Sequence, residues 1–141
     1  MSIEISIRTL FAQKLHEAVA GLEYTYLVDL NSGDVAVAYP VEESKAGTYI
    51  AEICGTTTSQ FEQRARSLNK NNDSLLLTSM EILTTHDKNN MRIATYRIND
   101  SFALCLIGKE ETFRPAFAKR LCDGPIKDEI EEILEQFNIS G

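Results

Sequence analysis

The sequence contains no tryptophan and few of the residues that usually mark a chemical site. Its 141 residues include two histidines, three cysteines, three prolines and seven dispersed glycines. No apolar run approaches the roughly 20 residues that a membrane-spanning helix needs. No glycine-rich segment matches a phosphate-binding loop or a dinucleotide fingerprint. These absences argue against an integral membrane protein and a GTPase, and we expect no cofactor.

The cysteines form no Cys-x-x-Cys pair and lie far apart at Cys54, Cys105 and Cys122. Their apolar or helical surroundings are typical of buried free thiols rather than metal ligands. The opening segment, residues 1–6, has no basic cluster followed by an apolar block. We therefore expect no secretory leader and a cytoplasmic location.

Positive charge is also scarce, because 14 basic residues face 21 acidic ones and the net charge is −7. The average field of such a chain repels phosphate backbones and anionic membrane surfaces. We expect neither nucleic acid among its partners nor direct insertion into a membrane. A chain of this length folds around one core without a metal or disulfide, so residues 1–141 are predicted to form a single domain.

Catalysis would need a nucleophile, a base and an orienting group within hydrogen-bond reach of one another. The histidines are the first candidates for the base. His16 falls on the polar side of a predicted helix and His86 falls in a predicted loop, so we expect both on the surface. With no catalytic residue to name, we predict that the protein is not an enzyme.

The hydrophobic period changes along the chain in the order helix, two strands, long helix, three strands, helices. The predicted helices cover residues 7–20, with Ser6 as the cap, 45–68, 111–122 and 126–137. The predicted strands cover residues 23–30, 35–39, 74–85, 91–98 and 101–107. Several strands are apolar on both sides, which requires cover on both faces of the sheet and indicates an α+β sandwich.

The long helix is unusual at its centre, where Gly55 is followed by three threonines and a serine, all poor helix formers. One interpretation is a kink. The other is that the glycine lets another backbone approach, as a twin helix across a two-fold axis would need. One side of the helix is expected to carry its apolar residues: Ile50, Ile53, Cys54, Thr57, Phe61, Ala65 and Leu68.

Residues 26–38, YLVDLNSGDVAVA, resemble the opening hairpin of the roadblock (dynein light chain) family. The long helix, the three-strand meander and a closing helix follow in that family's order over about residues 7–122. The final helix, about residues 125–138, and the glycine-threonine stretch depart from the family pattern. The resemblance implies a five-stranded antiparallel sheet in the order 2-1-5-4-3, with the long helix on one face and the terminal helices on the other.

The resemblance also implies pairing with a second copy or a paralogue, and binding or regulation of a small Ras-like GTPase. The third strand agrees with pairing, because residues 74–83 include no proline, no lysine and only Glu81 as a charge. A sheet edge of this kind has nothing to block another strand. The predicted dimer interface consists of Ile53, Thr57 and Phe61 on the long helix and Leu76, Thr78 and Met80 on the third strand.

Three further sets of residues each allow a functional and an ordinary interpretation. Arginines could act as a finger in trans on a GTPase, or form surface ion pairs: Arg64, Arg66, Arg92, Arg97, Arg114 and Arg120. The acids of the final helix could bind a divalent cation, or form a solvated face: Asp128, Glu129, Glu131, Glu132 and Glu135. The apolar stripe of that helix could dock on a partner, or cover its own domain: Ile126, Ile130, Ile133, Leu134 and Phe137.

These observations predict a non-enzymatic, homodimeric adapter that regulates or scaffolds a small GTPase. The alternative is a sensor module of the PAS or profilin-like kind, in which helices over a similar sheet enclose a small ligand. Such a sensor needs a cavity with convergent polar groups, whereas an adapter needs a filled core and an open surface.

Overall fold

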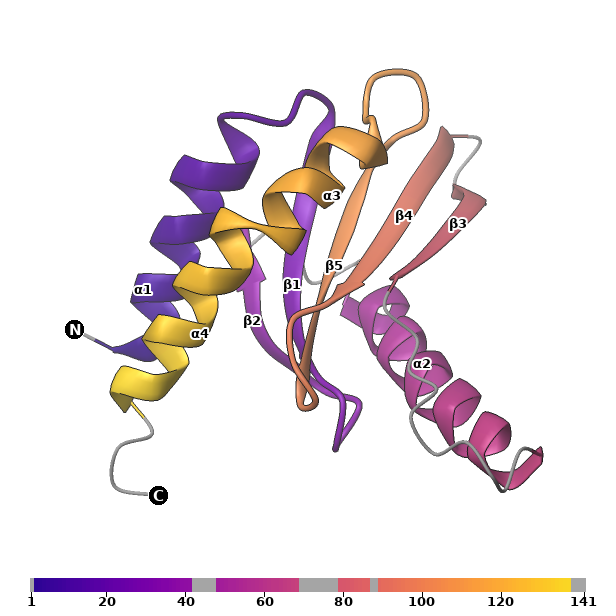
Figure 1. Cartoon of the computed structure of the whole chain (residues 1–141). Helices are drawn as coiled ribbons and strands as arrows, with labels where there is room; N and C mark the ends of the chain where they lie inside the picture. The colour runs from indigo at the N-terminus through magenta and orange to yellow at the C-terminus, as the bar shows by residue number, and fades with distance from the viewer. Residues whose placement is uncertain (1, 42–47, 69–78, 87–88, 138–141) are drawn as a thin grey trace.

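The computed structural model describes residues 2–41, 48–68, 79–86 and 89–137 (Figure 1). In chain order the elements are α1 (Ile3–Leu10), the π-helical segment η1 (Phe11–His16), β1 (Leu22–Asp29), β2 (Val35–Tyr39), α2 (Thr48–Leu68), β3 (Ser79–His86), β4 (Asn89–Arg97), β5 (Phe102–Lys109), α3 (Pro115–Asp123) and α4 (Pro125–Phe137). Within these residues, no helix is both long and apolar enough to span a bilayer.

The five strands form one antiparallel sheet in the order β2-β1-β5-β4-β3. Helices α1, α3 and α4 cover one face and α2 lies on the other (Figure 1). The predicted α+β fold and its strand order are therefore confirmed. Strand β5 is central and buried from Ala103 to Gly108, as its nearly uninterrupted apolar sequence predicted.

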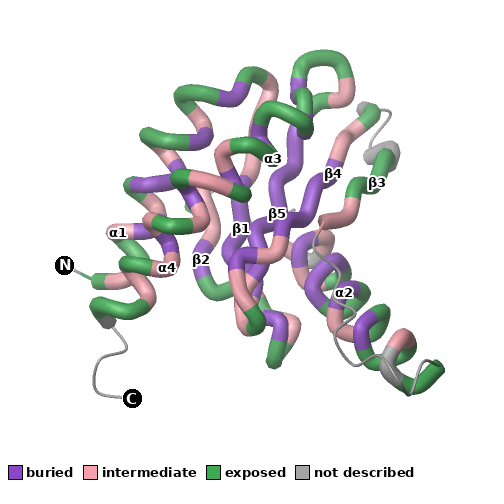
Figure 2. Tube along the Cα trace, in the orientation of Figure 1, coloured by how far each residue is buried: buried purple, intermediate pink, exposed green. Residues whose placement is uncertain are grey.

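Each face of the sheet has its own apolar cluster (Figure 2). The larger cluster lies beneath α1, α3 and α4, and includes the fully buried rings of Phe11, Tyr96 and Phe113. The smaller cluster lies beneath α2 and consists of Tyr26, Val28, Ala51, Cys54, Ile93, Cys105 and Ile107. Alternation of side chains along the strands separates the two sets.

The first helix begins four residues earlier than predicted, because Ser2 rather than Ser6 caps it. The Ile5 backbone N–H donates to Ser2 Oγ at 3.2 Å. Ser6 lies inside the helix, where its hydroxyl donates to the Ser2 carbonyl. Helix α3 begins later than predicted, at Pro115, because proline has no N–H to donate and is favoured at the first helical position.

Gly55 does not interrupt α2, which is one continuous helix from Thr48 to Leu68. A Cβ atom at Gly55 would lie 2.5 Å from Val28 Cγ1 of β1. The glycine therefore brings α2 against the chain's own sheet. Both interpretations of this residue, a kink and contact with a twin helix, are corrected by this packing.

The two outer strands of the sheet differ in what lies beside them. Next to β2, Arg8 Nε of α1 donates a hydrogen bond of 3.2 Å to the Ala38 carbonyl. Strand β3 lies at the other end of the strand order and pairs with β4. Its predicted start at residue 74 lies outside the described residues.

Candidate interaction surface

The side of α2 that faces the sheet is built mainly from small residues. Ala51, Cys54, Gly55 and Thr58 are all buried there. They recur at steps of three and four, which places them on one face of the helix. Helix α2 can therefore lie close to β1.

Next to this buried face, α2 carries an exposed apolar stripe. Ile53, Phe61 and Leu68 are 57%, 48% and 70% exposed, and the exposed Thr57 lies between Ile53 and Phe61. The apolar side predicted for this helix is buried only in part: Cys54 is buried and Ile50 packs against the smaller cluster, whereas the other large members are exposed. The three predicted interface residues on α2 all belong to the outer stripe.

Strand β3 places further apolar side chains at the end of the sheet. Met80 is partly buried and packs against the smaller cluster, which α2 also covers. Ile82 lies on the same face as Met80, and both Ile82 and Leu83 are exposed. The other two predicted interface residues, Leu76 and Thr78, lie outside the described residues.

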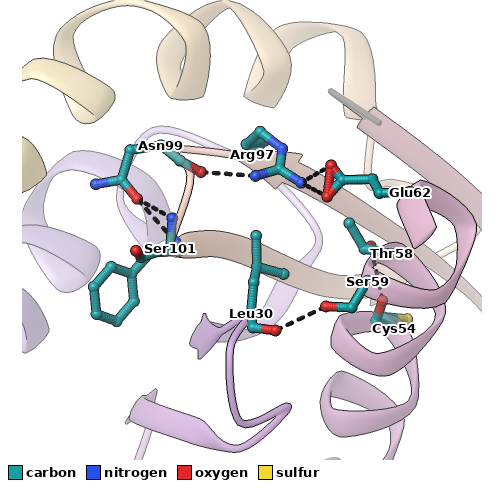
Figure 3. A network of polar contacts seen from close by, with 9 residues as sticks. Leu30, Cys54, Thr58, Ser59, Glu62, Arg97, Asn99 and Ser101 are labelled. Atoms are coloured by element: carbon teal, nitrogen blue, oxygen red, sulfur yellow. Dashed lines mark hydrogen bonds and ion pairs between the residues drawn. The ribbon is translucent and has the colours of Figure 1, made fainter. Parts of the chain in front are cut away.

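A polar network fixes α2 to the ends of the strands (Figure 3). Glu62 of α2 and Arg97 of β4 form an ion pair whose side chains are 8–10% exposed. Arg97 also donates to the Asn99 carbonyl at 3.0 Å. One turn earlier on the helix, the Ser59 hydroxyl donates to the Leu30 carbonyl at 2.7 Å. These contacts hold the segment that carries Phe61 on its outer side.

Arg97 therefore forms an ion pair within the chain, as in the alternative to a role as an arginine finger. Arg114 is exposed and donates to the Glu110 carbonyl at 3.2 Å. Arg64 and Arg120 are also exposed, and Arg92 is partly buried. The side chain of Arg66 lies outside the described residues.

His16 is not the surface residue that was expected. It is partly buried, with Nε2 2.8 Å from Thr25 Oγ1 and its ring edge-on to Tyr39 at 4.7 Å between centroids. Burial lowers the pKa of His16 to about 4. The cause of the wrong prediction is η1, whose wider turn shifts the helical period by which His16 was assigned to the polar side. The side chain of His86 is not described.

The apolar stripe of α4 packs against its own domain. Ile126 and Ile130 are buried in the larger cluster, and Ile133 and Leu134 pack against it. This corrects the docking hypothesis for these four side chains and corresponds to the alternative interpretation. Phe137 ends α4, and its side chain lies outside the description.

The acids of α4 lie on one helix without partners of the kind that a cation site requires. In the described part of the chain, no three His, Cys, Asp or Glu residues are grouped so that they could hold a metal ion. The exposed apolar side chains described above, on the outer stripe of α2 and on β3, are the candidate site.

Comparison with solved structures shows a likeness over nearly the whole chain. The chain matches Myxococcus xanthus MglB with a TM-score of 0.62 and 15% identity, over 95% of each chain. It matches the gliding protein MglB of Thermus thermophilus with a TM-score of 0.61, and MglB in a tetrameric arrangement with a TM-score of 0.65. Both of these are 14% identical and cover 96% of this chain and 93% of the other.

No protein-family model matches the sequence, and no curated protein matches it. The structural matches cover more of the chain than the expected core, residues 7–122, so they extend into the terminal segments. At these identities the likeness establishes the fold. Its element order, its strand order and the placement of α2 agree with the resemblance drawn from the hairpin at residues 26–38: this chain has the roadblock/LC7 fold, in the form seen in MglB.

Proposed function

We propose that this chain is a homodimeric adapter that binds and regulates a small Ras-like GTPase. The observation that carries the proposal is the exposed stripe of Ile53, Thr57 and Phe61 on a helix that is otherwise fixed to an MglB-like sheet. Regulation or binding of small GTPases is what the roadblock resemblance implies. The chain's part in it is a preformed surface rather than a catalytic group.

Self-association through α2 and β3 is supported by the energy that the exposed side chains would release. Fully burying one large aliphatic or aromatic side chain contributes about 1.5–3 kcal/mol. Ile53, Phe61 and Ile82 are 57%, 48% and 36% exposed, and a two-fold interface would bury both copies of each. The gain is several kcal/mol per subunit before the loss of translational and rotational freedom is subtracted. This gain favours association without fixing its affinity.

The proposed mechanism is differential binding. A surface that binds one nucleotide state of a GTPase more tightly than the other shifts the population toward that state by the difference in affinity. The Glu62–Arg97 ion pair and the Ser59 hydrogen bond support this role, because they hold α2 in one position for the second copy, and the resulting dimer is the surface offered to the GTPase. A preformed surface loses less conformational entropy on binding.

The proposal is tested by a pull-down with the Ras-like GTPases of the same genome, each loaded with GDP or with a non-hydrolysable GTP analogue. We expect retention to differ between the two states and to be lost in Phe61→Glu. The matched control is Ile5→Glu, which changes a side chain of similar exposure, 51%, on α1 across the sheet. Equal retention of both states, or equal loss in both variants, would contradict the proposal.

A further inference from the structure

Two cysteines meet where α2 crosses the sheet. Cys54 belongs to the inner face of α2 and Cys105 to the middle of β5, and both side chains are almost completely buried in the smaller cluster. In the sheet, Cys105 stands opposite Tyr26 of β1 and Thr95 of β4. Both cysteines are free thiols.

Gly55 explains why a helical cysteine reaches a strand cysteine. Because Gly55 has no side chain, α2 packs directly on Val28 of β1. Val28 lies two residues after Tyr26 and therefore on the same face of the sheet. Cys54 precedes Gly55, and its side chain is buried in the same cluster as Tyr26 and Cys105.

The surroundings of the two sulfur atoms favour an ionised Cys54. A hydrogen bond between the thiols lowers the pKa of Cys54 and raises that of Cys105. The buried hydroxyl of Thr95 has no hydrogen-bond partner in the described part of the chain, so it is available to donate to a thiolate once one forms. Of the two thiols, Cys54 is therefore the one that loses its proton more readily.

We propose that Cys54 and Cys105 form a redox-sensitive dithiol, which hydrogen peroxide converts into an intrachain disulfide between α2 and β5. In the first step the Cys54 thiolate attacks one peroxide oxygen, the O–O bond breaks, and hydroxide leaves a sulfenic acid on Cys54. The Cys105 sulfur then attacks Cys54 Sγ, and the sulfenic oxygen leaves as water. In total, two thiols and one peroxide give one disulfide and two waters.

Access of peroxide to the buried pair follows from how α2 is attached. Ala51, Cys54, Gly55 and Thr58 form much of its inner face, and small side chains bury little apolar area. Opening of α2 must also break the Glu62–Arg97 ion pair and the Ser59 hydrogen bond, so peroxide is expected to reach the pair slowly, through rare openings of this helix. Once closed, the disulfide would hold α2 on the sheet and prevent this opening.

Cys122 provides an internal contrast. It is buried in the larger cluster on the other face of the sheet, and burial raises its pKa to about 12. A thiol that stays protonated is a poor nucleophile toward peroxide. We therefore expect Cys122 to remain a thiol while the pair oxidises, although all three cysteines are equally inaccessible in the static structure.

The test treats the native full-length protein with hydrogen peroxide, quenches it, denatures it without reductant and alkylates the remaining thiols. Intact mass is expected to show the loss of two of the three alkylatable thiols, and dithiothreitol is expected to restore all three. Peptide mapping should identify a Cys54–Cys105 bond. In Cys105→Ser, dimedone should trap the sulfenic acid on Cys54.

Cys122→Ser is the matched control, and it should lose both of its thiols at the wild-type rate. The proposal is overturned if wild-type protein keeps three alkylatable thiols, if Cys122 enters the disulfide, or if the bond forms between chains. The wild-type measurement decides the question even if a variant fails to fold. It is also independent of whether the chain binds a GTPase.

Discussion

Arg97 at the end of β4 and Glu62 on α2 form a buried ion pair, the one strong electrostatic contact described between the long helix and the sheet. The cost of removing the two charges from water opposes their mutual attraction. The main effect of the pair is therefore to fix the position of α2 on the sheet. Because the pair sits one residue beyond Phe61 on α2, it determines where the outer stripe is presented.

Replacement of Glu62 by alanine should lower the free energy of unfolding by about 3–5 kcal/mol, because Arg97 would remain buried without its carboxylate. Urea unfolding followed by circular dichroism measures the change. The control is Glu4→Ala, which removes the acid of the exposed Glu4–Arg8 pair at 3.6 Å and should cost about 1 kcal/mol or less. If the two variants lost similar free energies of unfolding, the buried pair would contribute no more than an exposed one, which would contradict this prediction.

Gly55→Ala should destabilise the chain by about 1–3 kcal/mol, because the new methyl group would overlap Val28 Cγ1. This loss opposes the gain of about 1 kcal/mol that alanine brings to a helix interior. The exposed Ser67→Ala on the same helix has only the propensity effect and should be neutral or slightly stabilising. In a Val28→Ala background, Gly55→Ala should lower the free energy of unfolding by less than it does in the wild-type chain. If the losses of the two single variants simply add in the double variant, the contact between Gly55 and Val28 is refuted.

Met80→Lys and Phe61→Glu should each shift the proposed dimer toward monomers, because a charge would be buried at β3 or on the outer stripe of α2. Light scattering at micromolar concentration should change from about 32 kDa, twice the mass of the 15.8 kDa chain, toward one chain mass. Ile5→Glu on α1 should remain dimeric. If the Met80→Lys variant still has the mass of a dimer, β3 is not part of the interface.

Stability should fall with pH between about 6.5 and 4 through His16. Its pKa is about 4 in the folded chain and 6.5 in the unfolded one, so the unfolded chain binds the extra proton in this interval. The contribution of His16 is therefore fully present above pH 6.5 and is lost as the pH falls. His16→Gln should flatten the plot of unfolding free energy against pH above pH 5. Parallel plots for wild type and His16→Gln would contradict this assignment.

Much of the fold could be predicted because its signals are local. The turn at residues 31–34, the buried strand β5 and the apolar periods of the helices are each encoded by neighbouring residues. The strand order came from the family resemblance rather than from period, since sequence period does not state which strands are adjacent. Pro115 illustrates a boundary that was predicted only to within a turn.

The errors arise where weak or distant signals decide. The inner face of α2 consists of small residues such as Ala51 and Thr58, whereas its outer face carries the larger Ile53 and Phe61. A hydrophobic pattern weighted by size therefore followed the larger side chains and left Ala51 and Thr58 out of the predicted side. The pairing of Glu62 with Arg97 joins residues 35 positions apart, and no local pattern announces it.

The contact of Arg8 with the Ala38 carbonyl has a consequence for how large an assembly can become. A strand that paired with β2 would first have to displace this guanidinium from the Ala38 carbonyl. In the proposed arrangement this cost favours growth of the sheet at β3 and so favours pairs over longer assemblies.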